Sequence, residues 1–394
     1  MTEALAGLLV LPDRVLEGVV AIDGDRLGYV GPASGWTGPT PRPVPVIAPG
    51  FVDVHCHGGG GKSLTVADPD ELRSAAGHHL ERGTTTVVAS LVSAPAAEIS
   101  DAVAAIADVT GLSEGPAIAG SHLEGPFIGP GHRGAHDASH LRDPDVATTR
   151  EWLSRGRGTV RMMTLAPELR GADEVASLLR AAGAIAAYGH TDADAATFAA
   201  ALSAGADHGM PALVTHLFNG MEPMHHRTPG PVAASLAALR AGRTRAELIA
   251  DGIHLADETV RMVFEIAPPG GVVLVSDAMA AAGLTDGDYR LGTLEVRVAD
   301  GVARVVHPDG SVGSIAGSTI HLADAVRRCV VDVGLDPVDV VAAATATPAE
   351  VLGLRDRGRL AAGLLADLVV LGEDWRVTEV IHRGAPVPRP TPAP

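Results

Sequence analysis

The strongest constraint on the fold is a rhythm of short apolar segments that alternate with alanine- and leucine-rich stretches between residue 50 and about residue 345. An apolar run of about four to eight residues, bounded by turn residues, is typical of a buried strand. Eight such segments occur, at residues 50–55, 84–90, 117–123, 160–165, 185–190, 213–217, 246–250 and 272–276. Eight strands separated by helices predict an α/β fold, a closed (β/α)8 TIM barrel.

The two ends of the chain lack this alternation and carry strand patterns instead. Residues 15–30 predict a hairpin that turns at Asp23-Gly24-Asp25. The prolines between Pro39 and Pro49 predict a stiff connector into the barrel. Two further strands are expected over residues 366–371 and 377–381.

These patterns predict a division into two domains. We expect residues 1–49 and 350–394 to form one small β-sandwich domain built from both chain ends. Residues 50–349 are expected to form the catalytic barrel. Within it, a β insertion at about residues 285–315 separates the eighth strand from a helix over residues 320–333.

Charge and cysteine content restrict the partners. The formal net charge is −17, which repels nucleic acids and anionic membranes, so we expect neither as a partner. An anionic small molecule would need a local cluster of cationic groups and backbone N–H donors. Cys56 and Cys329 make no disulfide framework, and the first residues lack the basic region of a signal peptide. With no apolar run of bilayer length, a cytoplasmic protein is expected.

A His-x-His pair ends the first expected strand. His55 and His57 are two residues apart, and such side chains point to the same face of a strand, so both imidazoles can converge on one metal ion. The glycines from Gly58 to Gly61 let the backbone leave the strand at angles that other residues resist. Taken alone, such a pair is more often a loop pair that faces solvent.

Polar side chains also follow five other strands, at the end where barrel active sites form. Glu124, His190 and His216 are a strong three-ligand set that leaves a coordination position open for water, as in catalytic zinc sites. A bound divalent metal lowers the pKa of that water to about 7 and supplies hydroxide at neutral pH. Asp277 is a candidate to take the proton and return it to a leaving group. Its alternative role is to cap the next helix.

Several segments carry a family resemblance that covers nearly the whole chain. They are Pro49-Gly50-Phe51-Val52-Asp53-Val54-His55, His122-Leu123-Glu124-Gly125-Pro126, Gly189-His190, Thr215-His216-Leu217-Phe218-Asn219-Gly220-Met221, Asp251-Gly252-Ile253-His254, Ser276-Asp277-Ala278 and Ala316-Gly317-Ser318. On these motifs the chain resembles the amidohydrolase superfamily and, within it, the family of N-acetylglucosamine-6-phosphate deacetylases. The segments around Glu124 and His216 are the specific ones.

The resemblance implies a chemistry. Glu124, His190 and His216 would hold a primary divalent metal, with zinc expected first and iron, cobalt or manganese left open. Metal-bound hydroxide would attack the acetamide of N-acetylglucosamine 6-phosphate, and Asp277 would protonate the departing amine. The products would be glucosamine 6-phosphate and acetate, in amino-sugar catabolism and cell-wall recycling. Some relatives lack the first-strand histidines; because His55 and His57 are present here, one or two ions per subunit remain open.

The resemblance also assigns the substrate contacts. Asn219, Gly220 and Arg227 would bind the sugar phosphate with His254 nearby, and His136 would contact the substrate. Backbone N–H groups and an arginine fork are both sensible phosphate ligands. Arg227 and His254 are expected to act across the interface of a homodimer.

Four alternatives remain open. A dihydroorotase-like cyclic amidase commonly bridges two metals with a carboxylated lysine after the fourth strand, but residues 160–167 contain none and Lys62 is the only lysine. An adenosine-deaminase-like barrel would not explain the segment from Asn219 to Arg227. N-acetylgalactosamine 6-phosphate as the substrate, and a non-catalytic sugar-phosphate-binding protein on the same fold, are the others.

Overall fold

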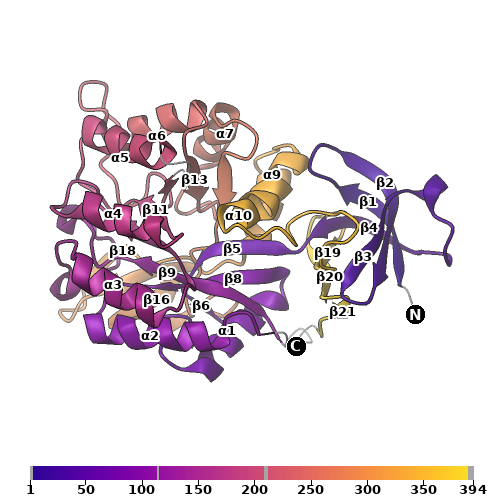
Figure 1. Ribbon diagram of the computed structural model, residues 1–394, viewed down its shortest axis with the longest axis horizontal. Coiled ribbons are helices and arrows are strands. Elements are labelled where there is room, and N and C mark those ends of the chain that lie inside the picture. Colours follow the sequence, from indigo (N-terminus) through magenta and orange to yellow (C-terminus); the bar gives the residue numbers. More distant parts are fainter. Residues whose placement is uncertain (1–2, 113–114, 208–211, 389–394) are drawn as a thin grey trace.

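The computed structural model describes residues 3–112, 115–207 and 212–388. It consists of a helix-covered barrel and a smaller sheet that lies at one end of the molecule, drawn on the right in Figure 1. No helix of the described residues is long and apolar enough to cross a membrane.

Eight parallel strands form the barrel. In the order of their pairing they are β14 (Val272–Leu274), β13 (Arg245–Leu248), β12 (Leu213–Val214), β11 (Ile185–Tyr188), β10 (Val160–Leu165), β9 (Ala117–Glu124), β8 (Thr84–Leu91) and β5 (Phe51–Cys56). The segment after β14 joins the two ends of the sheet, because the N–H of Asp277 donates to the carbonyl of His55 (2.9 Å) and Cys56 bridges to Ala278. The predicted α/β fold with a TIM barrel is confirmed.

Helices follow the barrel strands and cover the outside of the sheet, as Figure 1 shows for α2 to α5. The helices are α1 (Pro69–Leu80), α2 (Ala96–Val109), α3 (Val146–Arg155), α4 (Ala172–Ala181), α5 (Ala195–Asp207), α6 (Gly230–Arg240), α7 (Asp257–Ile266), α8 (Leu322–Val331), α9 (Pro337–Ala344) and α10 (Ala346–Val351). Short 3-10 helices lie at Ala33–Gly35, Pro130–His132 and Ala138–His140. The helix predicted over residues 320–333 is α8.

Four barrel strands end earlier than the sequence predicted. The expected strands at 185–190, 213–217, 246–250 and 272–276 stop at Tyr188, Val214, Leu248 and Leu274. His190, His216 and Asp277 have positive φ angles of 47°, 24° and 49°, which a pleated strand does not accommodate. The polar residues therefore lie on turns that leave the strands.

A second sheet joins the two ends of the chain. Its order is β21 (Ala385–Pro386), β20 (Val377–His382), β19 (Leu368–Leu371), β4 (Arg42–Pro49), β1 (Ala4–Val10), β2 (Val15–Asp23) and β3 (Arg26–Pro32). The hairpin predicted over residues 15–30 is β2 and β3. The division into domains at residues 49/50 and 349/350 remains a prediction.

The proline-rich connector was predicted wrongly, because it forms β4 in the middle of this sheet. β19 pairs with β4 only from Val46 onward, whereas Pro43 lies opposite Ala6 of β1. Pro43 and Pro45 thus lie where β4 has a paired neighbour on one side only, and a missing N–H is tolerated there.

The predicted insertion is a four-stranded antiparallel sheet, formed by β15 (Gly287–Leu291), β16 (Leu294–Ala299), β17 (Val302–Val306) and β18 (Val312–Ile315). Asp300 and Gly301 both have positive φ, as a two-residue hairpin turn requires. Leu291 and Val296 pack with Met279, which fixes the insertion to the segment after β14. A minor hairpin of β6 (Gly58–Gly59) and β7 (Lys62–Ser63) follows β5.

The interior of the barrel is apolar away from the site. Val52 and Val54 of β5 and Met162 of β10 pack in one buried cluster with Ala349 and Leu352, which lie in and directly after α10. This packing closes the barrel at the end opposite the polar strand ends, so the site has one open side.

Candidate active site

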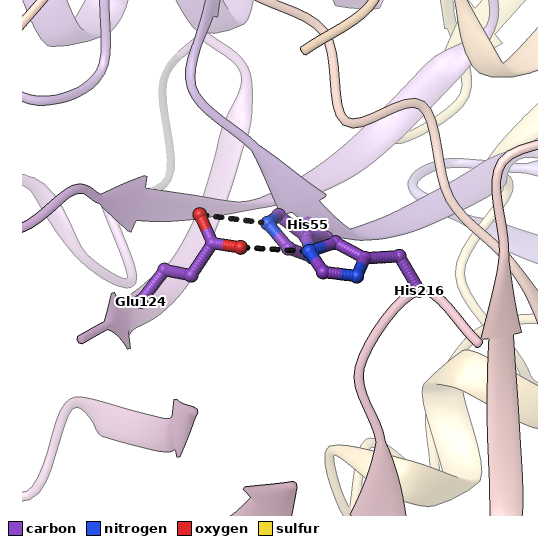
Figure 2. A group of neighbouring side chains, drawn as sticks. All are labelled: His55, Glu124 and His216. Atoms are coloured by element: carbon purple, nitrogen blue, oxygen red, sulfur yellow. Dashed lines mark hydrogen bonds and ion pairs between the residues drawn. The ribbon is translucent and has the colours of Figure 1, made fainter. Parts of the chain in front are cut away.

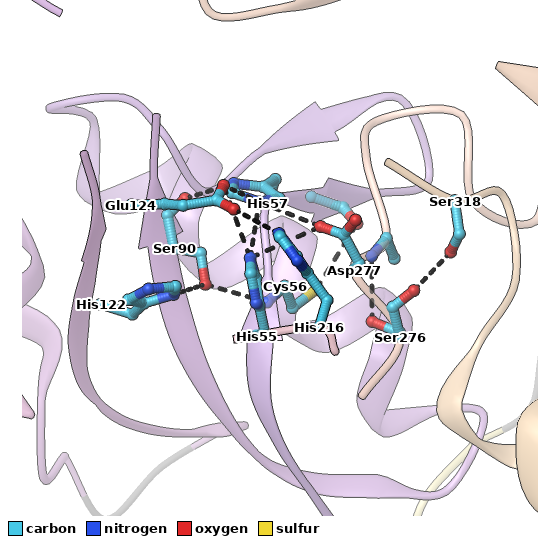
Figure 3. A network of polar contacts seen from close by, with 12 residues as sticks. His55, Cys56, His57, Ser90, His122, Glu124, His216, Ser276, Asp277 and Ser318 are labelled. Atoms are coloured by element: carbon cyan, nitrogen blue, oxygen red, sulfur yellow. Dashed lines mark hydrogen bonds and ion pairs between the residues drawn. The ribbon is translucent and has the colours of Figure 1, made fainter. Parts of the chain in front are cut away.

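The predicted metal and catalytic residues converge at the carboxyl ends of the strands. His55 lies in β5, with His57 just after it, and Glu124 is the last residue of β9. The remaining predicted members lie on the turns after β11, β12 and β14; they are His190, His216 and Asp277. All six are buried. Residues separated by more than 200 positions in the chain are thus brought into one cluster (Figure 3).

Glu124 lies at the centre of this cluster. Its Oε1 is 2.9 Å from His216 Nε2 and 3.1 Å from His190 Nε2. Its Oε2 is 3.2 Å from His57 Nε2 and 3.5 Å from His55 Nε2. Figure 2 shows the carboxylate facing His55 and His216 with one oxygen each. The two oxygens therefore face two separate pairs of imidazoles, an arrangement that suits one metal on either side.

Asp277 faces the first-strand histidines. Its Oδ1 is 3.2 Å from His57 Nε2 and 3.5 Å from His55 Nε2. The φ of +49° that turns this side chain inward is uncommon for a residue other than glycine. Such strained residues occur preferentially at functional sites.

The partners of the histidines determine which ring nitrogen is free. His57 Nδ1 lies 3.0 Å from the carbonyl oxygen of Ser90, and His190 Nδ1 lies 2.7 Å from that of His132. A carbonyl oxygen only accepts, so in the neutral ring each Nδ1 carries the proton and each Nε2 presents a lone pair to the centre. This is the usual state of a histidine ligand, and the residues therefore fit a divalent metal.

His136 has the opposite tautomer. The backbone N–H of Ser93 donates to His136 Nδ1 (3.2 Å), so the proton of the neutral ring lies on Nε2. That Nε2 is 3.5 Å from Glu124 Oε2. Burial lowers the pKa of His136, which favours the neutral ring. Although its nitrogen is close enough to group with Glu124 and His190 as a ligand, His136 offers a hydrogen-bond donor.

The carboxylates and imidazoles of the cluster stabilise each other's charged forms. Burial raises the pKa of Asp277, but the hydrogen bond from His57 and the charge of His55 outweigh it and bring the pKa to about 2. Burial likewise opposes charging of His57, yet Asp277 and Glu124 raise its pKa to about 9. The carboxylates thus stay ionised at neutral pH with a protonated imidazole as their partner, and a bound metal cation would take the place of that proton.

The site opens into a cavity of about 210 Å³ whose lining includes four of the five predicted substrate residues, which are His136, Asn219, Gly220 and His254. Leu291, Ser314 and Ile315 of the inserted sheet cover it from one side. Arg227 does not line this cavity and is exposed on the loop after β12.

Two of these residues have defined local reasons for their position. Asp251 Oδ2 accepts from His254 Nδ1 (2.7 Å), while Asp251 Oδ1 accepts from the backbone N–H groups of Ile253 and His254. Gly220 has a φ of +61°, and a Cβ there would lie 2.6 Å from His190 Nδ1. The absence of a side chain at Gly220 therefore leaves room for the imidazole of His190, a candidate metal ligand.

Several residues that support the predicted ligands were not predicted from the sequence. Glu247 of β13 is buried, and its Oε2 accepts from His55 Nδ1 (3.0 Å). Ser90 supplies the carbonyl for His57, and its Oγ lies 3.0 Å from His122 Nδ1 (Figure 3). The sequence does contain a signal for Glu247, because it is a charged residue inside the otherwise apolar strand expected over residues 246–250. The carbonyl contacts of Ser90 and His132 leave no trace in the sequence.

A buried carboxylate–imidazole cluster at the mouth of a (β/α)8 barrel defines a metal-binding hydrolase of the barrel class. The chain belongs to the amidohydrolase family, whose model matches residues 46–387.

The names of individual relatives indicate a more specific activity than the family does. An N-acetylglucosamine-6-phosphate deacetylase of Bacillus subtilis is 34% identical over 86% of this chain and 84% of its own. An N-acetylgalactosamine-6-phosphate deacetylase of Escherichia coli O157:H7 is 33% identical over 88% of both chains. The structure of a mutant N-acetyl-D-glucosamine-6-phosphate deacetylase from Mycobacterium smegmatis in complex with N-acetyl-D-glucosamine-6-phosphate is 38% identical, with a TM-score of 0.89 over 98% of this chain and 99% of that one. The resemblance predicted from the sequence is confirmed.

Proposed function

We propose that this protein hydrolyses the acetamide of N-acetylglucosamine 6-phosphate to glucosamine 6-phosphate and acetate, in amino-sugar catabolism and cell-wall recycling. The relatives that it matches over most of its length carry this activity in their names, and one was solved with this sugar phosphate bound. The observation that carries the proposal is the position of Glu124 between the imidazoles of His190 and His216, with Asp277 beside the same centre.

The metal centre is proposed to be held by Glu124, His190 and His216, with His55 and His57 available for a second ion. A divalent metal held there would supply acidified water at neutral pH and Lewis-acid polarisation of the amide carbonyl. Zinc is the expected metal, because two imidazoles and one carboxylate are a common catalytic zinc set.

Asp277 is proposed as the acid/base. It is ionised at neutral pH, so it can accept a proton from the attacking water. It then returns this proton to the nitrogen of the leaving amine, because an amine leaves far more readily when protonated. His136, which presents Nε2–H toward the centre, is proposed to donate to an oxygen of the substrate.

Recognition of the phosphate is assigned to Asn219, Gly220 and His254, together with Arg227 of a second subunit; the expectation that His254 also acts across the interface is revised, because His254 lines the cavity of its own chain. The first three line the cavity, whereas Arg227 is exposed outside it, in accord with a role in a neighbouring site of a homodimer. Local donors of this kind are needed because the chain as a whole carries a net charge of −17.

One alternative substrate has direct support, since the relative from Escherichia coli is named for N-acetylgalactosamine 6-phosphate. The cyclic-amidase alternative is disfavoured by β10, which ends in Met163, Thr164 and Leu165 and has no lysine. The proposal assigns the reaction to the cytoplasm, since Cys56 and Cys329 are both free and buried.

Acetate release tests the proposal. The protein, loaded with zinc, would receive N-acetylglucosamine 6-phosphate, N-acetylgalactosamine 6-phosphate and the unphosphorylated sugar in parallel. Rapid release from the glucosamine derivative alone supports the assignment, and a chelator should abolish it until metal is restored. Release from neither phosphate would contradict the substrate, and equal release with and without the phosphate would contradict the phosphate site.

A further inference from the structure

Glu247 is a buried carboxylate that the proposed mechanism does not use. It lies in β13, its side chain has no exposed surface, and its neighbours Ala246 and Leu248 belong to the core. An ionised group in such surroundings destabilises the folded protein unless specific hydrogen-bond donors compensate its charge. Its contacts therefore indicate why it is there.

A single oxygen of Glu247 contacts a residue of β5 and a residue on the turn after β12. Oε2 lies 3.0 Å from His55 Nδ1 and accepts the backbone N–H of His216 at 3.1 Å. Among the described residues Oε1 has no hydrogen-bond partner. The carboxylate thus links the histidine of β5 to the histidine after β12, which face opposite oxygens of Glu124.

The contact with His55 determines the state of that ring. A carboxylate oxygen at this distance accepts, so in the neutral, metal-binding form of the ring His55 Nδ1 carries the proton and Nε2 is left with its lone pair. This Nε2 lies 3.1 Å from His57 Nε2 and 3.5 Å from both Glu124 Oε2 and Asp277 Oδ1. A carboxylate behind a histidine also strengthens that histidine as a donor to a metal.

We propose that Glu247 is a positioning residue for a second metal ion, which it supports by fixing the tautomer and orientation of His55 and by strengthening that imidazole as a ligand through its negative charge. The inference rests on the metal centre of the proposed function. It goes beyond it in naming the residue on which the His55–His57 half of that centre depends.

Glu247→Gln is the variant that separates charge from shape. The carbonyl oxygen of the glutamine can replace Oε2 and accept both hydrogen bonds, while its amide group takes the place of the unpartnered Oε1. Glu247→Ala removes the acceptor altogether and leaves His55 free to change its tautomer. Asp53→Asn is a matched control, because Asp53 is also a buried carboxylate that contacts the backbone N–H of His55 but not its ring.

The experiment measures zinc ions bound per chain at buffered free zinc concentrations, on folded protein checked by circular dichroism. Wild type should bind two ions. Glu247→Gln and Glu247→Ala should weaken one of them by about 10–100-fold, the alanine variant more strongly, as expected for loss of an outer-shell partner. His55→Ala should lose the same ion, and Asp53→Asn should keep both affinities.

Each result has a defined meaning. Two ions bound with unchanged affinity in Glu247→Gln and Glu247→Ala would overturn the inference and leave the proposed function intact. If Glu247→Ala does not fold, Glu247→Gln alone decides. A single ion in wild type would also overturn the inference, because no second ion would exist for Glu247 to support. No ion in wild type would instead overturn the metal centre of the proposed function.

Discussion

The histidines of this site have two opposite roles, since some present a lone pair to the centre and one presents a proton. The hydrogen-bond partner of each ring decides which role it has. His57 and His190 face carbonyl oxygens at Nδ1 and so present lone pairs to the centre. His136 faces a backbone N–H at Nδ1 and so presents a proton. The distinction follows from whether the neighbouring backbone group donates or accepts.

At the scale of single residues, Asp277→Asn tests the proposed acid/base role of Asp277. The amide keeps the shape of the side chain but cannot accept and return a proton, so kcat should fall by about 10²–10⁴-fold. Metal content and the affinity for substrate should stay close to wild type, as measured by zinc analysis and by equilibrium binding. A variant with near-normal kcat would show that another group moves the proton.

The ion pair of His254 predicts how binding depends on pH. Burial lowers the pKa of His254, but the hydrogen bond and charge of Asp251 outweigh it and raise the pKa above 6.5. The imidazolium therefore persists below this raised pKa and is lost as pH rises through it. If His254 contacts the phosphate, KM should increase across that pH range.

Two variants separate this effect from ionisation of the substrate. Asp251→Asn removes the charge that raises the pKa of His254, so the increase in KM should move to lower pH. His254→Gln should have a high KM without this transition. A profile that Asp251→Asn leaves unchanged would contradict a role of His254 in phosphate binding.

At the scale of elements, the strands end where the functional residues begin. β11, β12 and β14 stop two or three residues before His190, His216 and Asp277, each of which has a positive φ. The barrel behind them is closely packed, so the rigid strands hold these strained turns in place. The four-stranded insertion then covers one side of the cavity through Leu291 and Ile315.

α3 depends on one aromatic anchor, and Trp152→Ala tests it. Trp152 is 1% exposed, its ring centroid is 5.6 Å from that of Phe127, and its Nε1 donates to the carbonyl of Ala96 at 3.0 Å. Removing this ring should lower the free energy of unfolding by about 3–5 kcal/mol. Denaturant titration measures the change.

Trp36→Ala is a matched control at a tryptophan outside α3. Trp36 also donates to a backbone carbonyl, that of Pro39, but it is only partly buried in the small sheet. Its loss should cost clearly less, because less apolar surface is removed from water. Equal losses in both variants would mean that burial of Trp152 does not anchor α3.

At the scale of the whole molecule, both ends of the chain meet in one sheet, where β19 pairs with β4. The barrel carries the candidate site, and Arg227 lies exposed outside its cavity. A substrate with a phosphate would thus find most of its ligands in one subunit, and the proposed dimer would add the arginine.

Subunit complementation tests that dimer. Asp277→Asn and Arg227→Ala chains would be expressed separately and together, each with low activity alone at substrate concentrations below KM. In a mixed dimer, one of the two sites combines the intact Asp277 of one chain with the intact Arg227 of the other, so activity should return. Coexpressed chains that are only as active as the sum of the separate variants would contradict a shared site.

The sequence by itself determined the barrel, its eight strands, the insertion and the six residues that now lie in one cluster, because each follows from apolar periodicity and from polar residues at strand ends. It misplaced the connector at Pro43, since pairing with β1 is a contact between distant segments. Only the tertiary structure decided the tautomers of His57 and His136 and the place of Glu247 behind His55. Those features depend on which backbone groups and buried charges meet across strands, and local sequence patterns carry no information about such encounters.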